Sequence, residues 1–406
     1  MSKHPPGLLF IVNSLRLGGA EKQVVTLLNH LDTSRFRLHL AYLKRGEHLL
    51  PQLNVAKLDE LLCCDVSRGI QRRALRQLGS LISTHHIDAI VCTNTYSMLY
   101  GYLARRATPC SDDRLAGRGG KPKLATVFHT TLLRTYKEKA QMMLYQRLFR
   151  RSDLLLYVCE NQRDYWRERG LRAAADGVVH NGIDVSHFSD LQTPEEKVEI
   201  RRSLGFTPQD YVIGLCSSLR PEKAHGDLLQ ALARLRLQGI PAKALFIGDG
   251  PERSTIETTA REIGVHEHLV ITGLQQDVRP FIACCDVMTL VSHSIETFSL
   301  AALESMALGK ALVMSDIGGA SEQVVHGKTG LLFEPGDLEA LTEHLKSFTA
   351  ASVRARMGAA AQHRVRQLFT VEAMTASFTE QMSRLLESPC SPPALQDHAA
   401  NGSYLT

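Results

Sequence analysis

The sequence predicts an α/β protein built from two Rossmann-like domains. Short apolar segments alternate with helical patterns in both halves of the chain, which is typical of parallel sheets covered by helices on both faces. A length of 406 residues is too great for one core and suits two domains of about 180 to 200 residues each. The predicted strands are residues 8–12, 37–43, 88–93, 124–128 and 154–158 in the first half, and 211–216, 243–247, 269–272, 287–291 and 311–314 in the second.

The boundary between the domains is expected between about residues 181 and 209. There the segments NGIDVSHF and TPEEKVEIRR separate the two series of strands. We therefore assign residues 1–180 to the first domain and residues 181–387 to the second. Residues 388–406 are rich in Pro, Ser and Asn without periodicity, so we expect a disordered tail.

Charge is divided unevenly between the halves. Residues 1–180 hold 28 Lys and Arg against 15 Asp and Glu, whereas residues 181–406 hold 19 against 27. The basic half is expected to attract anions. Its stretch 134–151 alternates cations with Met143, Leu144, Leu148 and Phe149, as an interfacial helix on an anionic membrane does, although a core helix with a solvated basic rim has the same pattern.

Composition excludes several classes of protein. No apolar run reaches the roughly 18 residues of a membrane-spanning helix, and no basic motif studded with aromatic residues indicates nucleic-acid binding. The nine cysteines show no Cys-x-x-Cys spacing, which favours reduced thiols in a cytoplasmic protein and gives no metal site.

Two carboxylates, Glu296 and Glu304, are the most informative functional residues. They stand eight residues apart across a helix start at Thr297 or Ser299, with Glu304 about two turns in. At roughly 1.5 Å rise per residue they are about 12 Å apart along the axis, so they can bind two separated parts of one ligand. The amides of residues 298 to 300 are expected to be free and to favour a phosphate between them. A capping residue beside a solvated face is the structural alternative.

Two further segments carry anion-binding features. Arg220 and Lys223 follow the strand that ends near Cys216, and the carboxyl ends of strands are where open α/β sheets bind ligands. Arg and Lys together can hold a diphosphate, although a pair of solvated loop charges is the alternative. After the strand 8–12, the loop with Gly18 and Gly19 lets the backbone approach an anion before a helix begins.

Five motifs stand in order along the chain and together resemble one family. They are Gly18-Gly19-Ala20-Glu21, Asn181-Gly182-Ile183-Asp184, Arg220 with Lys223, Glu296 with Glu304, and Gly318-Gly319 followed by Glu322. This pattern is similar to the retaining GT-B nucleotide-sugar glycosyltransferases of the large Glu-x7-Glu group, glycosyltransferase family four, over about residues 7 to 387. Thr297 and Ala224 stand where many relatives have Gly, which puts loop geometry and donor fit in question.

The resemblance implies the GT-B fold, in which two Rossmann-like domains face each other across a cleft and the last helix, residues 371 to 387, returns to the first domain. It implies a donor, a nucleotide-diphosphate sugar, bound on the second domain, and no other cofactor. Glu296 would hold the donor sugar, Arg220 and Lys223 the diphosphate, and His129 would face the donor from the first domain. The donor-binding residues would be Gly18, Gly19, Thr297, Phe298, Ser299, Leu300, Glu304 and Glu322, with Glu304 on the ribose.

The expected activity is transfer of a sugar to a glycan or a lipid-linked acceptor with retention of anomeric configuration. No Asp-x-Asp occurs, which favours a metal-independent site. We expect a cytoplasmic protein that, for a lipid-linked acceptor, binds peripherally to the inner face of the cytoplasmic membrane. The alternative is an inactive sugar-nucleotide-binding or scaffold protein of the same fold. Among enzymes, an epimerase or phosphorylase of similar shape is the runner-up, and an oxidoreductase lacks support because GGAEKQ has no Gly-x-Gly-x-x-Gly.

Overall fold

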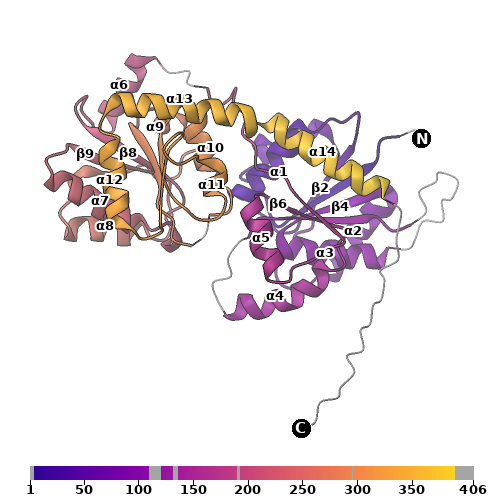
Figure 1. Cartoon of the computed structure of the whole chain (residues 1–406). Coiled ribbons are helices and arrows are strands. Elements are labelled where there is room, and N and C mark those ends of the chain that lie inside the picture. Colours follow the sequence, from indigo (N-terminus) through magenta and orange to yellow (C-terminus); the bar gives the residue numbers. More distant parts are fainter. Residues whose placement is uncertain (1–3, 109–119, 131–135, 190–192, 295, 389–406) are drawn as a thin grey trace, which may run out of the picture.

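Two parallel sheets with helices on both faces make up the protein (Figure 1). The computed structural model describes residues 4–108, 120–130, 136–189, 193–294 and 296–388, except for the side chains of residues 136–140 and 194. Among these residues the first sheet has seven strands and the second has six. The predicted tail lies almost wholly outside the described residues.

The first sheet belongs to the N-terminal half and has the order β3-β2-β1-β4-β5-β6-β7. All pairs are parallel, and β1 lies between β2 and β4. The strands are β1 (Gly7–Val12), β2 (Arg37–Tyr42), β3 (Leu58–Cys63), β4 (Ile87–Thr93), β5 (Lys123–Phe128), β6 (Leu154–Tyr157) and β7 (Ala175–Val178). The order reverses between β1 and β4, as in doubly wound folds.

The second sheet repeats this design with the order β10-β9-β8-β11-β12-β13. Its strands are β8 (Tyr211–Cys216), β9 (Ala242–Ile247), β10 (Leu269–Ile271), β11 (Val287–Leu290), β12 (Leu312–Ser315) and β13 (Leu331–Phe333). The order reverses between β8 and β11, which is the topological switch point where such sheets bind ligands. The predicted fold class, two Rossmann-like domains, is confirmed.

Helices cover both faces of each sheet. In the first domain they are α1 (Gly19–His30), α2 (Arg72–Thr84), α3 (Asn94–Ala107), α4 (Tyr136–Phe149) and α5 (Glu160–Glu168). The later helices are α6 (Pro194–Ser203), α7 (His225–Leu237), α8 (Arg253–Glu262), α9 (Arg279–Ala283), α10 (Leu300–Ala307), α11 (Ala320–Gln323), α12 (Leu338–Ser347), α13 (Ala351–Leu368) and α14 (Val371–Glu387). Short 3₁₀ turns are η1 (Leu50–Gln52), η2 (Val55–Lys57), η4 (Pro221–Lys223) and η5 (His266–His268).

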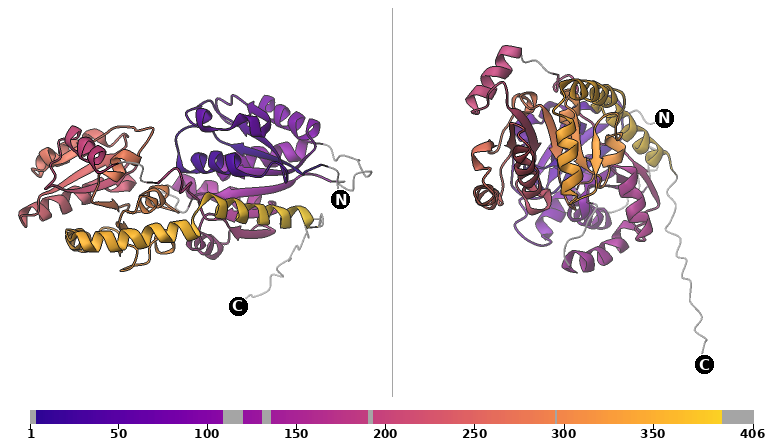
Figure 2. Two further views of the ribbon diagram at one scale, coloured as in Figure 1. Left: turned by 90° about the horizontal axis from the view of Figure 1, so that it is seen from above. Right: turned by 60° about the vertical axis from the view of Figure 1, so that its left-hand side comes forward.

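The last two helices connect the domains. Helix α13 packs on α10 in the second domain, and α14 packs on α1 in the first. The rings of Phe378 in α14 and Phe10 in β1 have centroids 5.8 Å apart. Helices α13 and α14 follow each other along both domains (Figure 2). Between them, the carbonyl of Phe369 accepts the amide of Ile183 at 2.9 Å, so the two segments that pass from one domain to the other lie side by side.

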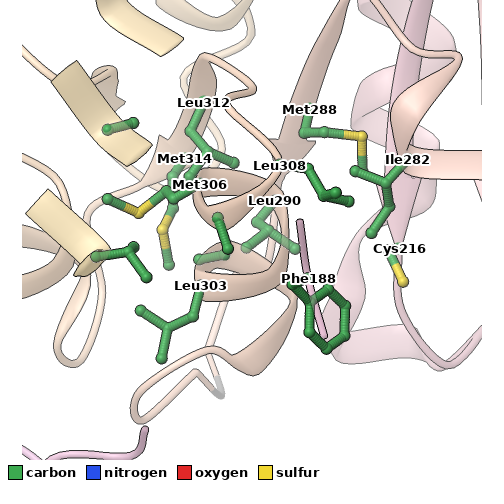
Figure 3. Packing of buried hydrophobic residues seen from close by; sticks show 14 of the residues in the cluster. Phe188, Cys216, Ile282, Met288, Leu290, Leu303, Met306, Leu308, Leu312 and Met314 are labelled. Atoms are coloured by element: carbon green, nitrogen blue, oxygen red, sulfur yellow. The ribbon is translucent and has the colours of Figure 1, made fainter. Parts of the chain in front are cut away.

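The core of the second domain holds α10 firmly. Leu303 and Met306 of α10 are buried together with Leu312 and Met314 of β12 (Figure 3). Because the central strands are buried on both faces, they appear in the sequence as continuous apolar runs such as YVIGLC. The packing fixes where α10 begins, and the loop before it carries Glu296.

Candidate donor site at the interdomain junction

The predicted charged residues meet at the switch point of the second sheet. Arg220 and Lys223 lie in the loop 217–224 after β8, and Glu296 lies in the loop 291–299 after the neighbouring strand β11. We call the region where these two loops meet α1, α5 and α10 the interdomain junction. The carboxyl ends of β8 and β11 therefore bring Lys223 and Glu296 into contact, and Arg220 lies on the same loop three residues before Lys223.

Lys223 and Glu296 form an ion pair. The Lys223 ammonium lies 2.5 Å from Oε2 of Glu296, and the same oxygen accepts a hydrogen bond from the hydroxyl of Ser292 at 3.1 Å. Their side chains are 18% and 12% exposed, so this pair is screened from water far more than a surface pair is. The contact holds the Glu296 carboxylate in one position. Ser292 was not identified from the sequence.

Arg220 stands beside this pair on the same loop. Its carbonyl accepts the Lys223 amide at 3.0 Å, and its side chain is exposed. In the described part of the chain its guanidinium has no hydrogen-bond or ion-pair partner, so it is open to an anion. Ala224 next to Lys223 adopts the left-handed conformation, with φ 49° and ψ 43°. A Cβ is strained in that region, so glycine would adopt this conformation more easily than alanine does.

Glu304 lies on α10 and points toward the first domain. Helix α10 begins at Leu300 with Ser299 as its N-cap, so Glu304 is its fifth residue. The sequence predicted Glu304 about two turns into this helix. It lies closer to the start, because Ser299 rather than Thr297 caps the helix. Oε1 of Glu304 lies 2.5 Å from the ammonium of Lys22 in α1, and the Glu304 side chain is only 7% exposed. Lys22 was missed because nothing in the sequence indicated a contact across 282 residues.

The expectation of three free amides at the start of α10 was wrong for Ser299. Its N–H donates to Oε1 of Gln323 at 3.0 Å, and the Gln323 amide group donates back to the Ser299 carbonyl at 2.8 Å. A buried amide needs a partner, and Gln323 of α11 provides it. The side chain of Phe298 is buried against the rings of His180 and Phe369.

The glycine loop of the first domain faces the start of α10. A Cβ at Gly19 would lie 3.9 Å from the side chain of Leu300, so Gly19 and Leu300 are near neighbours across the junction. Gly18 has extended backbone at the N-cap of α1, and a Cβ there would lie 2.4 Å from Oε2 of Glu21. Glycine thus keeps the first turn of α1 accessible from the second domain.

The Gly318-Gly319 turn supports the loop that carries Glu296. Gly318 has φ 58°, and a Cβ there would lie 1.8 Å from the carbonyl oxygen of Glu296. The Gly319 amide donates to the carbonyl of Thr297 at 2.7 Å. These glycines are therefore needed for close backbone contact with residues 296–297.

His129 and Thr297 meet across the junction, but through the backbone of the histidine. The Thr297 hydroxyl donates to the His129 carbonyl at 2.9 Å, and the His129 amide donates to Oδ1 of Asn94 at 2.9 Å. Nε2 of His129 is buried and has no partner within the described residues. Burial lowers the pKa of His129 to about 4, so its imidazole is neutral at pH 7.

Glu322 links the domains. Its carboxylate accepts the amides of Glu160 and Asn161 at the start of α5, at 3.0 and 2.8 Å, and contacts Nε2 of His180 at 2.9 Å. Burial raises the pKa of Glu322, but the hydrogen bonds from His180, Asn161 and Glu160 outweigh it and lower the pKa overall. These contacts hold the start of α5 against the second domain.

Three structural observations concern the predictions about metals, thiols and membrane-spanning helices. Among the described residues no group of three or more His, Cys, Asp or Glu is arranged to hold a metal ion. The described cysteines are free thiols, and all but Cys63 are buried. None of the helices in the described ranges is long and apolar enough to cross a bilayer.

The two-domain fold is that of the GT-B glycosyltransferases. Crystal structures of Anabaena HepE in complex with UDP and with UDP-glucose match with TM-scores of 0.77 and 0.78, at 23% and 21% identity. Each match covers 93% of this chain, and 100% and 99% of the HepE chains. At this identity the likeness shows the fold.

Sequence comparison then gives the family. The model "Glycosyltransferase Family 4" matches residues 17–187, and "Glycosyl transferases group 1" matches residues 196–364. The chain is 28% identical over 201 residues to N-acetyl-alpha-D-glucosaminyl L-malate synthase of Bacillus anthracis, which covers 49% of this chain and 51% of that protein. It is 30% identical over 222 residues to GDP-mannose-dependent alpha-(1-6)-phosphatidylinositol monomannoside mannosyltransferase of Mycolicibacterium smegmatis, covering 52% and 57%. These alignments span little more than half the length of those relatives. The chain belongs to glycosyltransferase family 4.

Proposed function

We propose that this protein transfers a sugar from a nucleotide-diphosphate sugar to a hydroxyl group of a glycan or lipid-linked acceptor. The observation that carries the proposal is a set of two ion pairs at the interdomain junction, Lys223 with Glu296 at the switch point and Lys22 with Glu304 between α1 and α10. The HepE complexes with UDP and UDP-glucose support a nucleotide sugar as the ligand of this fold.

The donor's groups match the chemistry of the junction. The ribose hydroxyls donate to Glu304, and the hydroxyls of the transferred sugar donate to Glu296. Arg220 and Lys223 neutralise the diphosphate, Arg220 with a guanidinium that has no partner among the described residues and Lys223 with an ammonium 2.5 Å from Glu296. Two protein cations in a partly buried site stabilise the negative charge that builds on the leaving phosphate. For this reason we propose that transfer requires no metal ion.

The transfer step breaks the bond between the anomeric carbon and the phosphate oxygen and forms one to the acceptor oxygen. We propose that the leaving phosphate takes the acceptor hydroxyl's proton on the same face of the sugar, which retains the anomeric configuration. His129 is neutral at pH 7 and offers a hydrogen-bonding nitrogen rather than a charge. Its Nε2 is buried and lacks a partner in the described residues, so contact with the donor sugar requires the residues that cover it to move.

A thermal-shift panel followed by a transfer assay tests this function. UDP-glucose, UDP-N-acetylglucosamine, GDP-mannose and ADP-glucose are the donors to compare, and the true donor is expected to raise the melting temperature most. Transfer with that donor should continue in EDTA, and the product should keep the donor's anomeric configuration by NMR. Tight donor binding with no transfer to any acceptor would instead support an inactive sugar-nucleotide-binding protein.

The surface of helix α4 supports a lipid-linked acceptor. Met143 and Leu144 of this helix are 66% and 62% exposed, and Arg150 and Arg151 follow it on the surface. Exposed apolar groups beside cations suit an anionic membrane surface. The expected contribution of Phe149 to that surface was wrong, because Phe149 is fully buried against Phe128. The Mycolicibacterium relative named for a phosphatidylinositol acceptor agrees with this choice.

Co-sedimentation with vesicles tests the membrane contact. Wild type is expected to bind vesicles that contain phosphatidylglycerol at low salt, and Met143→Asp with Leu144→Asp should release it. Leu237→Asp is the matched control, because Leu237 is 89% exposed on α7 of the other domain. No binding of wild type at low salt would remove the membrane from the proposal.

A further inference from the structure

Lys22 is the one charged contact of the first domain with Glu304 in the described residues. It is the fourth residue of α1, and its ammonium lies 2.5 Å from Oε1 of Glu304. The same ammonium lies 5.6 Å from the centre of the Phe188 ring in the segment that links the domains. With 39% of its side chain exposed, Lys22 keeps room to move, whereas Glu304 at 7% does not.

The pair explains how the nearly buried carboxylate of Glu304 is tolerated. A buried charge without a partner is costly, and Lys22 neutralises Glu304 across the junction. The second ion pair, Lys223 with Glu296, does the same for the other carboxylate. Glu304 and Glu296 are therefore each matched by one lysine.

Donor binding changes this balance at Glu304. Ribose hydroxyls are neutral donors, so when they hydrogen-bond to Glu304 they compete with Lys22 without replacing its charge. An ammonium displaced from Glu304 needs another anion nearby. The diphosphate attached to the same ribose brings negative charge into this part of the junction.

The surroundings of Lys22 favour that anion. Gly19, three residues earlier on α1, is near Leu300 at the start of α10, so the first turn of α1 lies opposite the helix that carries Glu304. The amides of a helix's first turn carry partial positive charge. Lys22 adds a full charge on a flexible stem at the same end of α1.

We propose that Lys22 is a donor-binding residue supplied by the first domain, whose ammonium pairs with Glu304 and moves to the donor's diphosphate when the ribose occupies Glu304. The proposal rests on the proposed function, because it assigns a group to the same donor. It makes the first domain part of the nucleotide site, so that donor binding and contact between the domains are coupled.

Isothermal titration calorimetry of wild type, Lys22→Met and Lys22→Arg tests whether the Lys22 ammonium moves from Glu304 to the diphosphate. ADP, GDP and UDP are titrated first, and the tightest is then compared with its own nucleoside, adenosine, guanosine or uridine. Lys22→Met is expected to weaken the diphosphate about tenfold to a hundredfold, since it removes a charged hydrogen bond to phosphate. The nucleoside should bind Lys22→Met as well as or more tightly than wild type, because no ammonium competes for Glu304. Lys22→Arg should restore most of the diphosphate affinity.

Lys346→Met is the control for loss of one positive charge, since Lys346 lies on α12 with its side chain 47% exposed. Equal diphosphate affinity in wild type and Lys22→Met would overturn the proposal. Equal loss for nucleoside and diphosphate would also overturn it, because Lys22 would then only position Glu304. If Lys22→Met does not fold, Lys22→Gln compared with Lys22→Arg gives the same test. Wild type that binds none of the three nucleotides would count against the proposed function itself.

Discussion

Lys223 and Glu296 join the two loops at the switch point of the second sheet through a contact of 2.5 Å between Nζ and Oε2. The residues are 73 positions apart, and each follows a different strand. Because both side chains are mostly buried, the pair fixes the relative position of a cation and a carboxylate before any ligand arrives. Such preorganisation lowers the cost of binding a charged donor.

Replacing Lys223 with Ala is expected to lower transfer activity or donor affinity about ten- to a hundredfold. A hydrogen bond to a charged group contributes roughly 1.5 to 3 kcal/mol, and Glu296 also loses its partner. Steady-state kinetics with the donor found by thermal shift measures the effect, with Lys346→Ala as the control. Full activity in a folded Lys223→Ala protein would contradict the role of this lysine.

Ala224→Gly is expected to stabilise the protein by about 0.5 to 1 kcal/mol. Ala224 has φ 49°, where a Cβ is strained, and the gain is reduced by the greater freedom of glycine in the unfolded chain. Thermal or urea unfolding measures the difference. Ala233→Gly in the middle of α7 is the matched control and should destabilise by about 1 kcal/mol. A lower melting temperature for Ala224→Gly would show that the strain is absent.

Glu322→Ala should destabilise the contact between the domains by about 1 to 3 kcal/mol. The substitution removes the acceptor of two amides of α5 and the partner of His180. Hydrogen exchange should show faster exchange of the Glu160 and Asn161 amides, with Glu343→Ala on α12 as an exposed control. Unchanged exchange together with weaker donor binding would place Glu322 on the donor instead.

Stability should fall as the pH is lowered from about 6.5 toward 4. Burial is the largest cause that lowers the pKa of His39, His129 and His225 to about 4, so the unfolded chain binds more protons in this window. Each of these neutral histidines makes its full contribution to the free energy of unfolding above about pH 6.5. By pH 5 the free energy of unfolding has fallen by on the order of 2 kcal/mol for each histidine. Urea unfolding at pH 7 and pH 5 measures the drop. His39→Leu should reduce this drop in the free energy of unfolding between pH 7 and pH 5. His48→Leu, at an exposed position, is the control and should leave the drop unchanged. Equal drops in wild type and His39→Leu would contradict this explanation.

The fold could be predicted because the central strands are buried on both faces. Apolar runs such as LLFIV and YVIGLC allow few alternatives between helical segments. The strands that were missed lie toward sheet edges or are short: β3 carries Asp59 and Glu60, and β7 and β13 have only four and three residues. Their sheet positions are set by pairing with a neighbour, which a local pattern does not contain.

The site was predictable where its residues follow strands. Arg220, Lys223 and Glu296 could be placed together because the carboxyl ends of parallel strands share one edge. Lys22, Gln323 and the partners of Glu322 could not, since each makes its contact between elements far apart in the sequence. The direction of a side chain across the junction depends on how the two domains meet. That arrangement is fixed by the return of α14 to the first domain.

The measurement closest to the central claim is the affinity of Glu304→Gln for the tightest of ADP, GDP and UDP, determined by titration calorimetry. Gln keeps the size of the side chain and removes the negative charge that pairs with Lys22 and that we propose accepts hydrogen bonds from the ribose hydroxyls. We expect an affinity at least about tenfold below that of wild type, while Glu343→Gln binds like wild type. Equal affinity in Glu304→Gln and wild type would show that the nucleotide does not bind at the interdomain junction.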